Sequence, residues 1–164
     1  FTTQGDESLE FVLGTLLKKH TKTIATAESC TGGLLAERLT RVPGASDYFL
    51  GGHVTYSDQS KVTFLGISHA TIQKYGAVSK EIAMAMAKNI RLKYESDYGV
   101  GITGIAGPDG GSLTKPVGTV HICIVGSNKT LSRYEQRVFS GDRTRIRLQS
   151  AQWALEMQIG RAHV

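Results

Sequence analysis

The chain has 164 residues, of which 40% are hydrophobic and 20% are charged, and this composition is typical of one globular domain with its own core rather than of a disordered segment. No apolar run approaches the ~20 residues of a membrane helix, and the two cysteines exclude a disulfide framework and offer no zinc-ligand spacing. The net charge of +5 leaves two interpretations open, a mildly basic surface or a site for an anionic ligand.

Helical and extended patterns alternate along most of the chain. Apolar residues at helical spacing indicate a first helix, and Ser57, Ser68 and Ser79 are suitable N-caps for later ones. The predicted helices cover residues 9–17, 34–39, 57–65 and 79–94, with a short turn after residue 68 and a last helix from about residue 142. The predicted strands cover residues 23–27, 48–56, 98–103, 117–125 and 130–139. The Gly-Ser-Asn-Lys segment at residues 126–129 predicts an antiparallel hairpin between the last two strands.

This order of elements predicts an α/β fold. Strands that alternate with helices form a parallel sheet covered on both faces, and a terminal hairpin makes it mixed, so we expect a mostly parallel sheet of about five strands. No repeat or linker divides the sequence, and a single domain over residues 1–164 is expected. In such sheets ligands lie beyond the carboxyl ends of the parallel strands. Residues 28–33, 56–61 and 103–111 should therefore meet at one site.

Ser29 is the first candidate for chemistry, because it stands where a strand gives way to a helix and is followed by Cys30, Thr31 and two glycines. The free amides of such a turn, together with the positive end of the helix dipole, suit a nucleophile beside an oxyanion hole. A simple helix cap explains the same pattern, and the residues alone leave both interpretations open.

A nucleophilic serine needs a base. Of the five histidines, only His53 lies near a candidate segment, and it falls within a predicted strand. Lys61 is the alternative, but a lysine acts as a base only when neutral, and lowering its pKa from about 10.4 to near 7 destabilises the ammonium by about 4–5 kcal/mol. Burial can supply this, whereas an exposed Lys61 would be an ordinary surface residue.

Three further segments are rich in glycine or arginine and are candidate ligand-binding segments. The letters of residues 99–104 fit a dinucleotide-binding pattern, but they fall inside a strand and do not lead to a helix. Residues 103–111 fit a loop whose glycines allow close approach to a ligand, or a plain surface loop. Five arginines lie between residues 133 and 147 without interleaved aromatic residues, so a stacking platform for nucleic acid is not indicated. Arg143, at the start of the last helix, suits a phosphate, and Arg147 fits a solvated helix face.

Five segments in order carry a resemblance to a known family: AESCTGG at residues 27–33, YSDQSK at 56–61, TGIAGP at 103–108, KPVGTV at 115–120 and GDR at 141–143. Together they resemble the C-terminal domain family of CinA proteins, the nicotinamide-nucleotide amidases. Residues 5–9 resemble the junction of two-domain CinA proteins, so we expect the domain to come from a longer chain.

The resemblance implies a three-layer α/β/α fold and hydrolysis of the carboxamide of nicotinamide mononucleotide, without a metal or cofactor. It maps the catalytic serine, lysine and tyrosine of the family onto Ser29, Lys61 and Tyr56, with Tyr56 orienting Lys61 or relaying its proton. It maps a phosphate-contacting arginine onto Arg143. The remaining expected site residues are the oxyanion turn and the pocket floor: Cys30, Thr31, Gly32, Gly33, Thr103, Gly104, Ala106 and Gly107.

Some alternatives stay open at this point. Cys30 is a stronger intrinsic nucleophile than Ser29, and Asp109 puts a negative charge near a phosphate site in a loop where the family commonly has glycine. A catalytically weak nucleotide- or partner-binding module linked to competence is the second functional hypothesis. We expect a cytoplasmic protein with a small-molecule nucleotide as partner rather than a membrane or nucleic acid, and the last strand and helix could support a homo-oligomer.

Overall fold

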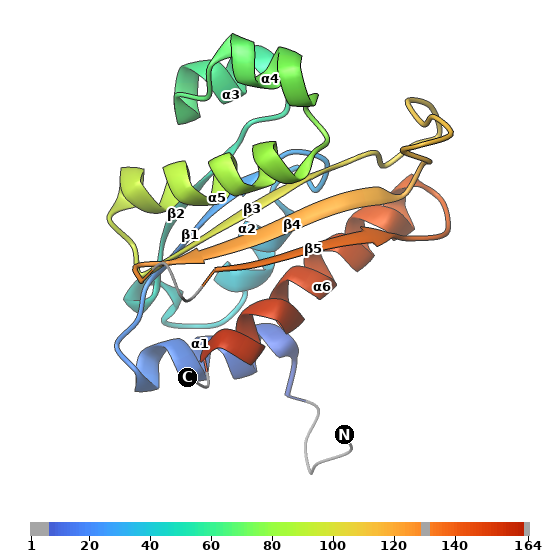
Figure 1. Ribbon diagram of the computed structural model, residues 1–164. Coiled ribbons are helices and arrows are strands. Elements are labelled where there is room, and N and C mark those ends of the chain that lie inside the picture. The colour runs from blue at the N-terminus through green and yellow to red at the C-terminus, as the bar shows by residue number, and fades with distance from the viewer. Residues whose placement is uncertain (1–6, 129–131, 163–164) are drawn as a thin grey trace.

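Five strands form a mixed sheet in the order β2-β1-β3-β4-β5 in the computed structural model, which describes residues 7–128 and 132–162 (Figure 1). They are β1 (Ile24–Glu28), β2 (Phe49–Val54), β3 (Tyr98–Gly104), β4 (Thr119–Gly126) and β5 (Arg133–Val138). The pairs β1–β2 and β1–β3 are parallel and the pairs β3–β4 and β4–β5 are antiparallel, so every strand except β4 runs in the same direction. The predicted mixed, mostly parallel sheet and its terminal hairpin are confirmed. Residues 130 and 131, the first two expected in the last strand, lie outside the described residues.

Helices cover both faces of this sheet. One face is covered by α1 (Leu9–Lys19), α2 (Leu34–Thr40) and α6 (Arg143–Ala162), and the other by α3 (Asp58–Leu65), α4 (His69–Tyr75) and α5 (Lys80–Tyr94), as Figure 1 shows. A short 3₁₀ helix, η1 (Ala45–Asp47), precedes β2. Separate apolar clusters fill the two spaces between helices and sheet. The three-layer α/β/α architecture implied by the resemblance is therefore present.

The predicted serine caps begin three of these helices. Ser57, Ser68 and Ser79 each accept a hydrogen bond from the amide three residues further on, at 3.1, 3.1 and 3.3 Å. Such a bond satisfies one of the amides that lack an intrahelical partner. The cap at Ser57 matters most for the site, because it starts α3 only a few residues after β2 ends.

Two glycines of β3 allow α5 to lie directly on the sheet. A Cβ on Gly99 would stand 2.1 Å from the Ala87 carbonyl oxygen, and one on Gly101 would stand 2.3 Å from that of Ala83. No side chain fits in these positions without moving the helix. Two of the three glycines that imitate a dinucleotide-binding pattern are thus explained by packing between α5 and β3.

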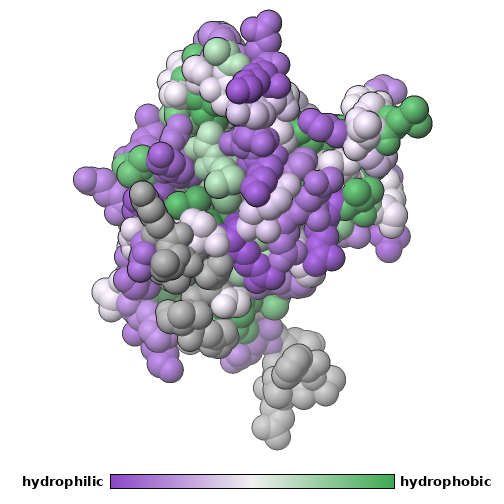
Figure 2. Space-filling view, in the orientation of Figure 1, coloured by the Kyte–Doolittle hydropathy of each residue, from purple (hydrophilic) through white to green (hydrophobic). Residues whose placement is uncertain are grey.

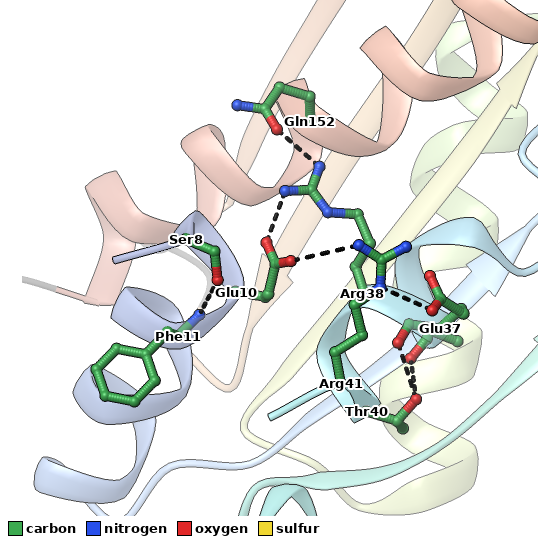
Figure 3. A network of polar contacts seen from close by, with 9 residues as sticks. Ser8, Glu10, Phe11, Glu37, Arg38, Thr40, Arg41 and Gln152 are labelled. Atoms are coloured by element: carbon green, nitrogen blue, oxygen red, sulfur yellow. Dashed lines mark hydrogen bonds and ion pairs between the residues drawn. The ribbon is translucent and has the colours of Figure 1, made fainter. Parts of the chain in front are cut away.

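A buried carboxylate ties α1 to the neighbouring helices (Figure 3). Glu10 of α1 is only 5% exposed, accepts a hydrogen bond from Arg38 Nη2 at 2.6 Å, and has Arg41 Nη1 at 3.8 Å. Arg38 also donates to Gln152 Oε1 of α6 at 2.7 Å. Burial alone would raise the pKa of Glu10, but the hydrogen bond and charge of Arg38 and the charge of Arg41 hold it below its usual value. The network therefore joins α1, α2 and α6 as long as Glu10 is ionised.

The arginines of the C-terminal part do not form one free basic patch. Arg133 and Arg137 both contact the carboxylate of Glu135 on β5, and the Arg137 guanidinium lies 3.8 Å from the centre of the Trp153 ring. The face seen in Figure 2 is mostly hydrophilic, with apolar side chains in scattered groups. In the described part of the chain, no helix combines the length and apolar character needed to cross a membrane.

Candidate active site

Two chain segments leave the sheet side by side at its carboxyl edge. Glu28, the last residue of β1, is in register with Val54 of β2 and with Ile102 of β3. The pairing continues past the strand ends, because the Ser29 amide donates to the Ile102 carbonyl at 2.9 Å and the Thr55 amide donates to the Glu28 carbonyl at 2.8 Å. The segments that follow β1 and β2 are thus fixed to each other at the edge where the sequence predicted a site.

Ser29 and Lys61 meet at this edge. Lys61 lies in the first turn of α3, and its side chain reaches back to the turn after β1. Its Nζ stands 3.2 Å from Ser29 Oγ, 2.9 Å from the Thr55 carbonyl oxygen and 3.3 Å from the Tyr56 carbonyl oxygen. Lys61 is 1% exposed and Ser29 is 8% exposed. Lys61 is therefore not an ordinary surface lysine.

The surroundings of Lys61 shift its protonation equilibrium toward the neutral amine. Burial lowers the pKa of Lys61, and the charge of Asp58 opposes this shift only in part. The carbonyl oxygens of Thr55 and Tyr56 can only accept hydrogen bonds, so they occupy the two N–H bonds of a neutral amine. The lone pair is then left for the third neighbour, the Ser29 hydroxyl. A lone pair within hydrogen-bond reach of an O–H group is the arrangement that a general base requires.

Cys30 does not compete with Ser29 as a nucleophile. Its side chain is 4% exposed and packs into the apolar cluster on the α1, α2 and α6 side of the sheet. Burial raises the pKa of the Cys30 thiol to about 12. Since the thiolate is the reactive form, this cysteine is unreactive near neutral pH.

The positive end of α2 is occupied by a side chain of the protein itself. The helix begins only at Leu34, so Ser29 is too far away to be its N-cap. The carboxylate of Glu28, which is 1% exposed, instead accepts the amides of Leu35 and Ala36 at 2.8 and 3.0 Å. Glu28 thus balances the helix dipole that the sequence assigned to an oxyanion site.

The turn between Ser29 and α2 offers fewer spare amides than expected. The Gly32 amide donates to the Ser29 carbonyl oxygen at 3.0 Å. None of the described residues accepts a hydrogen bond from the amides of Cys30, Thr31 and Gly33. These three N–H groups therefore have no acceptor within the described part of the protein.

Arg143 joins the loop after β3 to the segment after β2. Its Nη1 donates to the Gly107 carbonyl oxygen at 2.8 Å and its Nη2 donates to the Tyr56 hydroxyl at 2.6 Å. Arg143 is exposed, as is Tyr56, which has an exposed fraction of 56%. The Tyr56 hydroxyl therefore lies with Arg143, and Tyr56 contacts Lys61 through its carbonyl oxygen instead of the phenol that the resemblance assigned to orienting or relaying.

The end of β3 and the start of the loop that follows it are packed against neighbouring elements, and most of the rest of the loop is exposed. Thr103 is buried and donates its hydroxyl to the Ala77 carbonyl oxygen at 2.7 Å. A Cβ on Gly104 would stand 2.7 Å from Val120 Cγ2, and Ala106 is 4% exposed. Asp109 is exposed. The beginning of this loop is thus fixed against the neighbouring elements, and its later part faces solvent.

Two groups that shape this site had no assigned role in the sequence pattern. Glu28 caps α2 from the end of β1, and Arg147 of α6 donates to the carbonyl oxygens of Cys30 and Thr31 at 3.1 and 3.0 Å. Arg147 is half-buried, so the prediction of a solvated helix face was wrong. The available signal was its spacing, because residues four apart lie on one side of a helix, and Arg143 was already assigned to the site.

Comparison with known proteins identifies relatives over nearly the whole length. The family described as the CinA C-terminal domain matches residues 6–161. A CinA-like protein of Koribacter versatilis is 51% identical over 157 residues, which are 96% of this chain and 37% of that protein. A CinA-like protein of Thermotoga neapolitana is 50% identical over 151 residues, which are 92% of this chain and 36% of that protein. The chain thus spans little more than a third of the length of these relatives.

Solved structures agree with the fold. The competence/damage inducible protein CihA from Agrobacterium tumefaciens superposes with a TM-score of 0.87 at 36% identity, covering 97% of this chain and 98% of that one. A CinA superfamily protein from Klebsiella pneumoniae gives a TM-score of 0.91 at 28% identity, covering 98% of this chain and 99% of that one.

Proposed function

The chain belongs to the CinA C-terminal domain family, and from this membership and the contact between Lys61 and Ser29 we propose that it hydrolyses the carboxamide of nicotinamide mononucleotide to nicotinic acid mononucleotide and ammonia. The observation that carries the proposal is a buried amine 3.2 Å from a serine hydroxyl at the carboxyl edge of the sheet.

In the first half-reaction the Ser29 hydroxyl attacks the carboxamide carbon. Lys61 takes the hydroxyl proton on its lone pair, a bond forms between Oγ and the carbon, and the carbonyl electrons move to the oxygen. A spare amide of the turn after Ser29, that of Cys30, Thr31 or Gly33, is a donor for that oxyanion, a type of contact that contributes a factor of about 10²–10³ to kcat. The oxyanion then collapses, the C–N bond breaks, and the Lys61 ammonium gives its proton to the leaving nitrogen, which departs as ammonia.

Water completes the reaction on the acyl-enzyme. Lys61, again neutral, removes a proton from water as the hydroxide oxygen bonds to the carbon. The bond to Ser29 Oγ breaks and Lys61 returns the proton to it. One amine therefore serves as base and acid in turn, which requires a pKa near the working pH, and the burial of Lys61 moves its pKa in that direction.

Arg143 is the proposed phosphate contact. It lies at the exposed side of the site, bonded to the Tyr56 hydroxyl and to the Gly107 carbonyl oxygen. Its planar guanidinium has donors beyond these two, and the geometry of such a fork suits phosphate oxygens. Thr103 and Gly104 end β3 and Ala106 lies in the loop that follows, and these residues are the proposed floor of the substrate pocket.

Incubation of the purified domain with nicotinamide mononucleotide, with ammonia as readout, tests the proposal. We expect release by the unmodified chain, loss of release in Ser29→Ala, and retained nucleotide binding by that variant. Ammonia release at the unmodified rate by Ser29→Ala would remove the serine mechanism. Tight nucleotide binding by the unmodified chain without any release would instead identify a nucleotide-binding module, the second hypothesis drawn from the sequence.

A further inference from the structure

Arg147 is hydrogen-bonded to the turn that carries the proposed nucleophile. Its Nε donates to the Cys30 carbonyl oxygen at 3.1 Å and its Nη2 donates to the Thr31 carbonyl oxygen at 3.0 Å. The fit is close, because a Cβ on Gly32 would stand 3.1 Å from Nη2. Two neighbouring donors of one planar guanidinium thus hold two consecutive carbonyl groups in a fixed orientation.

The orientation of these carbonyls determines that of the following amides. In a trans peptide the C=O and N–H bonds of one unit point in opposite directions. Arg147 therefore turns the N–H groups of Thr31 and Gly32 away from itself. The Gly32 amide is bonded to the Ser29 carbonyl oxygen at 3.0 Å, while the Thr31 amide has no acceptor among the described residues. Arg147 thus leaves one free donor with a defined direction.

That direction leads toward the Ser29 hydroxyl. Arg147 comes from α6, on the side of the sheet where the Cys30 side chain is buried. Lys61 comes from α3, on the other side, and Ser29 Oγ lies next to its Nζ. An amide that points away from α6 consequently points to the side where the attack on the substrate takes place.

We propose that Arg147 is a positioning residue that aims the Thr31 amide at the oxyanion formed on attack by Ser29; this rests on the proposed function. A second effect acts in the same direction. The guanidinium charge at the Cys30 carbonyl polarises the peptide whose N–H belongs to Thr31, and hydrogen bonds linked through one group strengthen each other. The donor is oriented before the substrate arrives, which is the condition for strong transition-state stabilisation.

Kinetics of Arg147→Ala, Arg147→Lys and the matched control Arg145→Ala test this role. Arg145 is an exposed arginine of the same helix, so its replacement makes the same change in charge. We expect Arg147→Ala to lower kcat by about 10²-fold or more, the usual effect of losing an oxyanion donor, with KM within about threefold because the contact acts only in the transition state. Arg147→Lys keeps the charge but not the paired donors, so its kcat should lie between those of Arg147→Ala and the unmodified chain. The kcat of Arg145→Ala should equal that of the unmodified chain.

Two further readouts separate positioning from support of the fold. Millimolar guanidinium should restore part of the kcat of Arg147→Ala, and equal concentrations of sodium chloride or urea should not. A fluorophosphonate probe, whose phosphoryl oxygen needs the same donor, should label Ser29 about 10²-fold more slowly in Arg147→Ala, as measured by mass spectrometry. If the alanine variant does not fold, Arg147→Lys gives the same comparisons.

The labelling rate also separates this inference from the proposed substrate. Unmodified protein that labels on Ser29 but releases no ammonia, together with slow labelling of Arg147→Ala, would disprove the amidase proposal and support the role of Arg147. Equal kcat and equal labelling rates in Arg147→Ala and the unmodified chain would overturn that role even if ammonia is released. A fall in kcat without rescue, matched by a lower melting temperature, would also overturn it in favour of plain structural support.

Discussion

Replacing Lys61 with methionine removes the proposed base and keeps a side chain of similar length. Both half-reactions need the amine, and proton transfer by a positioned group contributes about 10²–10⁴ to the rate. We therefore expect kcat to fall by about 10³-fold or more, while KM stays within about threefold because Lys61 contacts Ser29 and two main-chain carbonyls and is not assigned to the phosphate.

The fold should tolerate this replacement. The variant loses hydrogen bonds to the carbonyl oxygens of Thr55 and Tyr56, each worth about 1 kcal/mol. It also removes a buried amine, since Lys61 is 1% exposed. A buried amine opposes folding whenever it is charged. Because the two effects oppose each other, the free energy of unfolding should change by no more than about 2 kcal/mol. Lys74→Met, at an exposed lysine of α4, is the matched control.

The pH dependence of kcat shows which protonation state of Lys61 is the active one. Burial lowers the pKa of Lys61, and the neutral amine is the active form, so kcat of the unmodified chain should rise with pH through that lowered pKa and then level off. Lys61→Met should lose this dependence. Since Ser29 and Lys61 act as one unit, the double variant Ser29→Ala/Lys61→Met should be no slower than Ser29→Ala alone.

Steady-state ammonia release measures all of these rates. Lys61 is not the base if Lys61→Met retains the kcat of the Lys74→Met control, or if the losses in the double variant multiply. Loss of nucleotide binding in Lys61→Met, with kcat unchanged, would instead make Lys61 a ligand contact.

The other predictions concern groups around the catalytic pair. Arg143→Ala should raise KM by about 10-fold, the value of a charge-assisted hydrogen bond, with little change in kcat; an unchanged KM would argue against a phosphate contact. Cys30→Ala should keep kcat within about twofold in the ammonia assay, because a thiol with a pKa of about 12 does not supply a thiolate, and a large loss would contradict that assignment. Glu10→Gln should destabilise the fold by about 1–3 kcal/mol at neutral pH. Because the folded state lowers the pKa of Glu10, the ionised carboxylate stabilises the fold above the unfolded-state pKa of about 4.3, and this stabilisation is lost as the pH falls below it. The free energies of unfolding of the unmodified chain and of Glu10→Gln, measured in urea, should therefore converge at low pH. A difference that stays constant with pH would contradict this role.

The fold follows from the sequence because its determinants are local. Apolar spacing indicates each helix, the serine caps act on amides three residues away, and the alternation of elements dictates a covered, mostly parallel sheet. The meeting of Ser29 and Lys61 also follows, since parallel strands bring their carboxyl ends to one edge. Whether Lys61 would be buried was not accessible from the residues, because its exposure depends on the packing of α3 against the end of β1.

Contacts between distant segments account for the features of the site that differ from the sequence-based expectations. Arg147 lies more than a hundred residues from the carbonyls it holds, and only the packing of α6 brings them together. Arg143 and Tyr56 are 87 positions apart in the chain, and the Arg143 guanidinium donates to the Tyr56 hydroxyl that the resemblance assigned to Lys61. The Glu28 carboxylate caps the N-terminus of α2, where a ligand was expected. It does so because it stands at the end of β1, where the first amides of α2 point.

The site therefore has two parts with different tolerance to change. Ser29 and Thr55 are held by main-chain hydrogen bonds at the end of β1, and the Lys61 amine is held by Thr55. The distance between base and nucleophile is thus set by the sheet itself. The side chains of Arg143 and Tyr56 are exposed and contact each other at the rim of the site. Because the reacting pair does not depend on these exposed groups, substitutions among them should alter which nucleotide binds and leave the proton transfer in place.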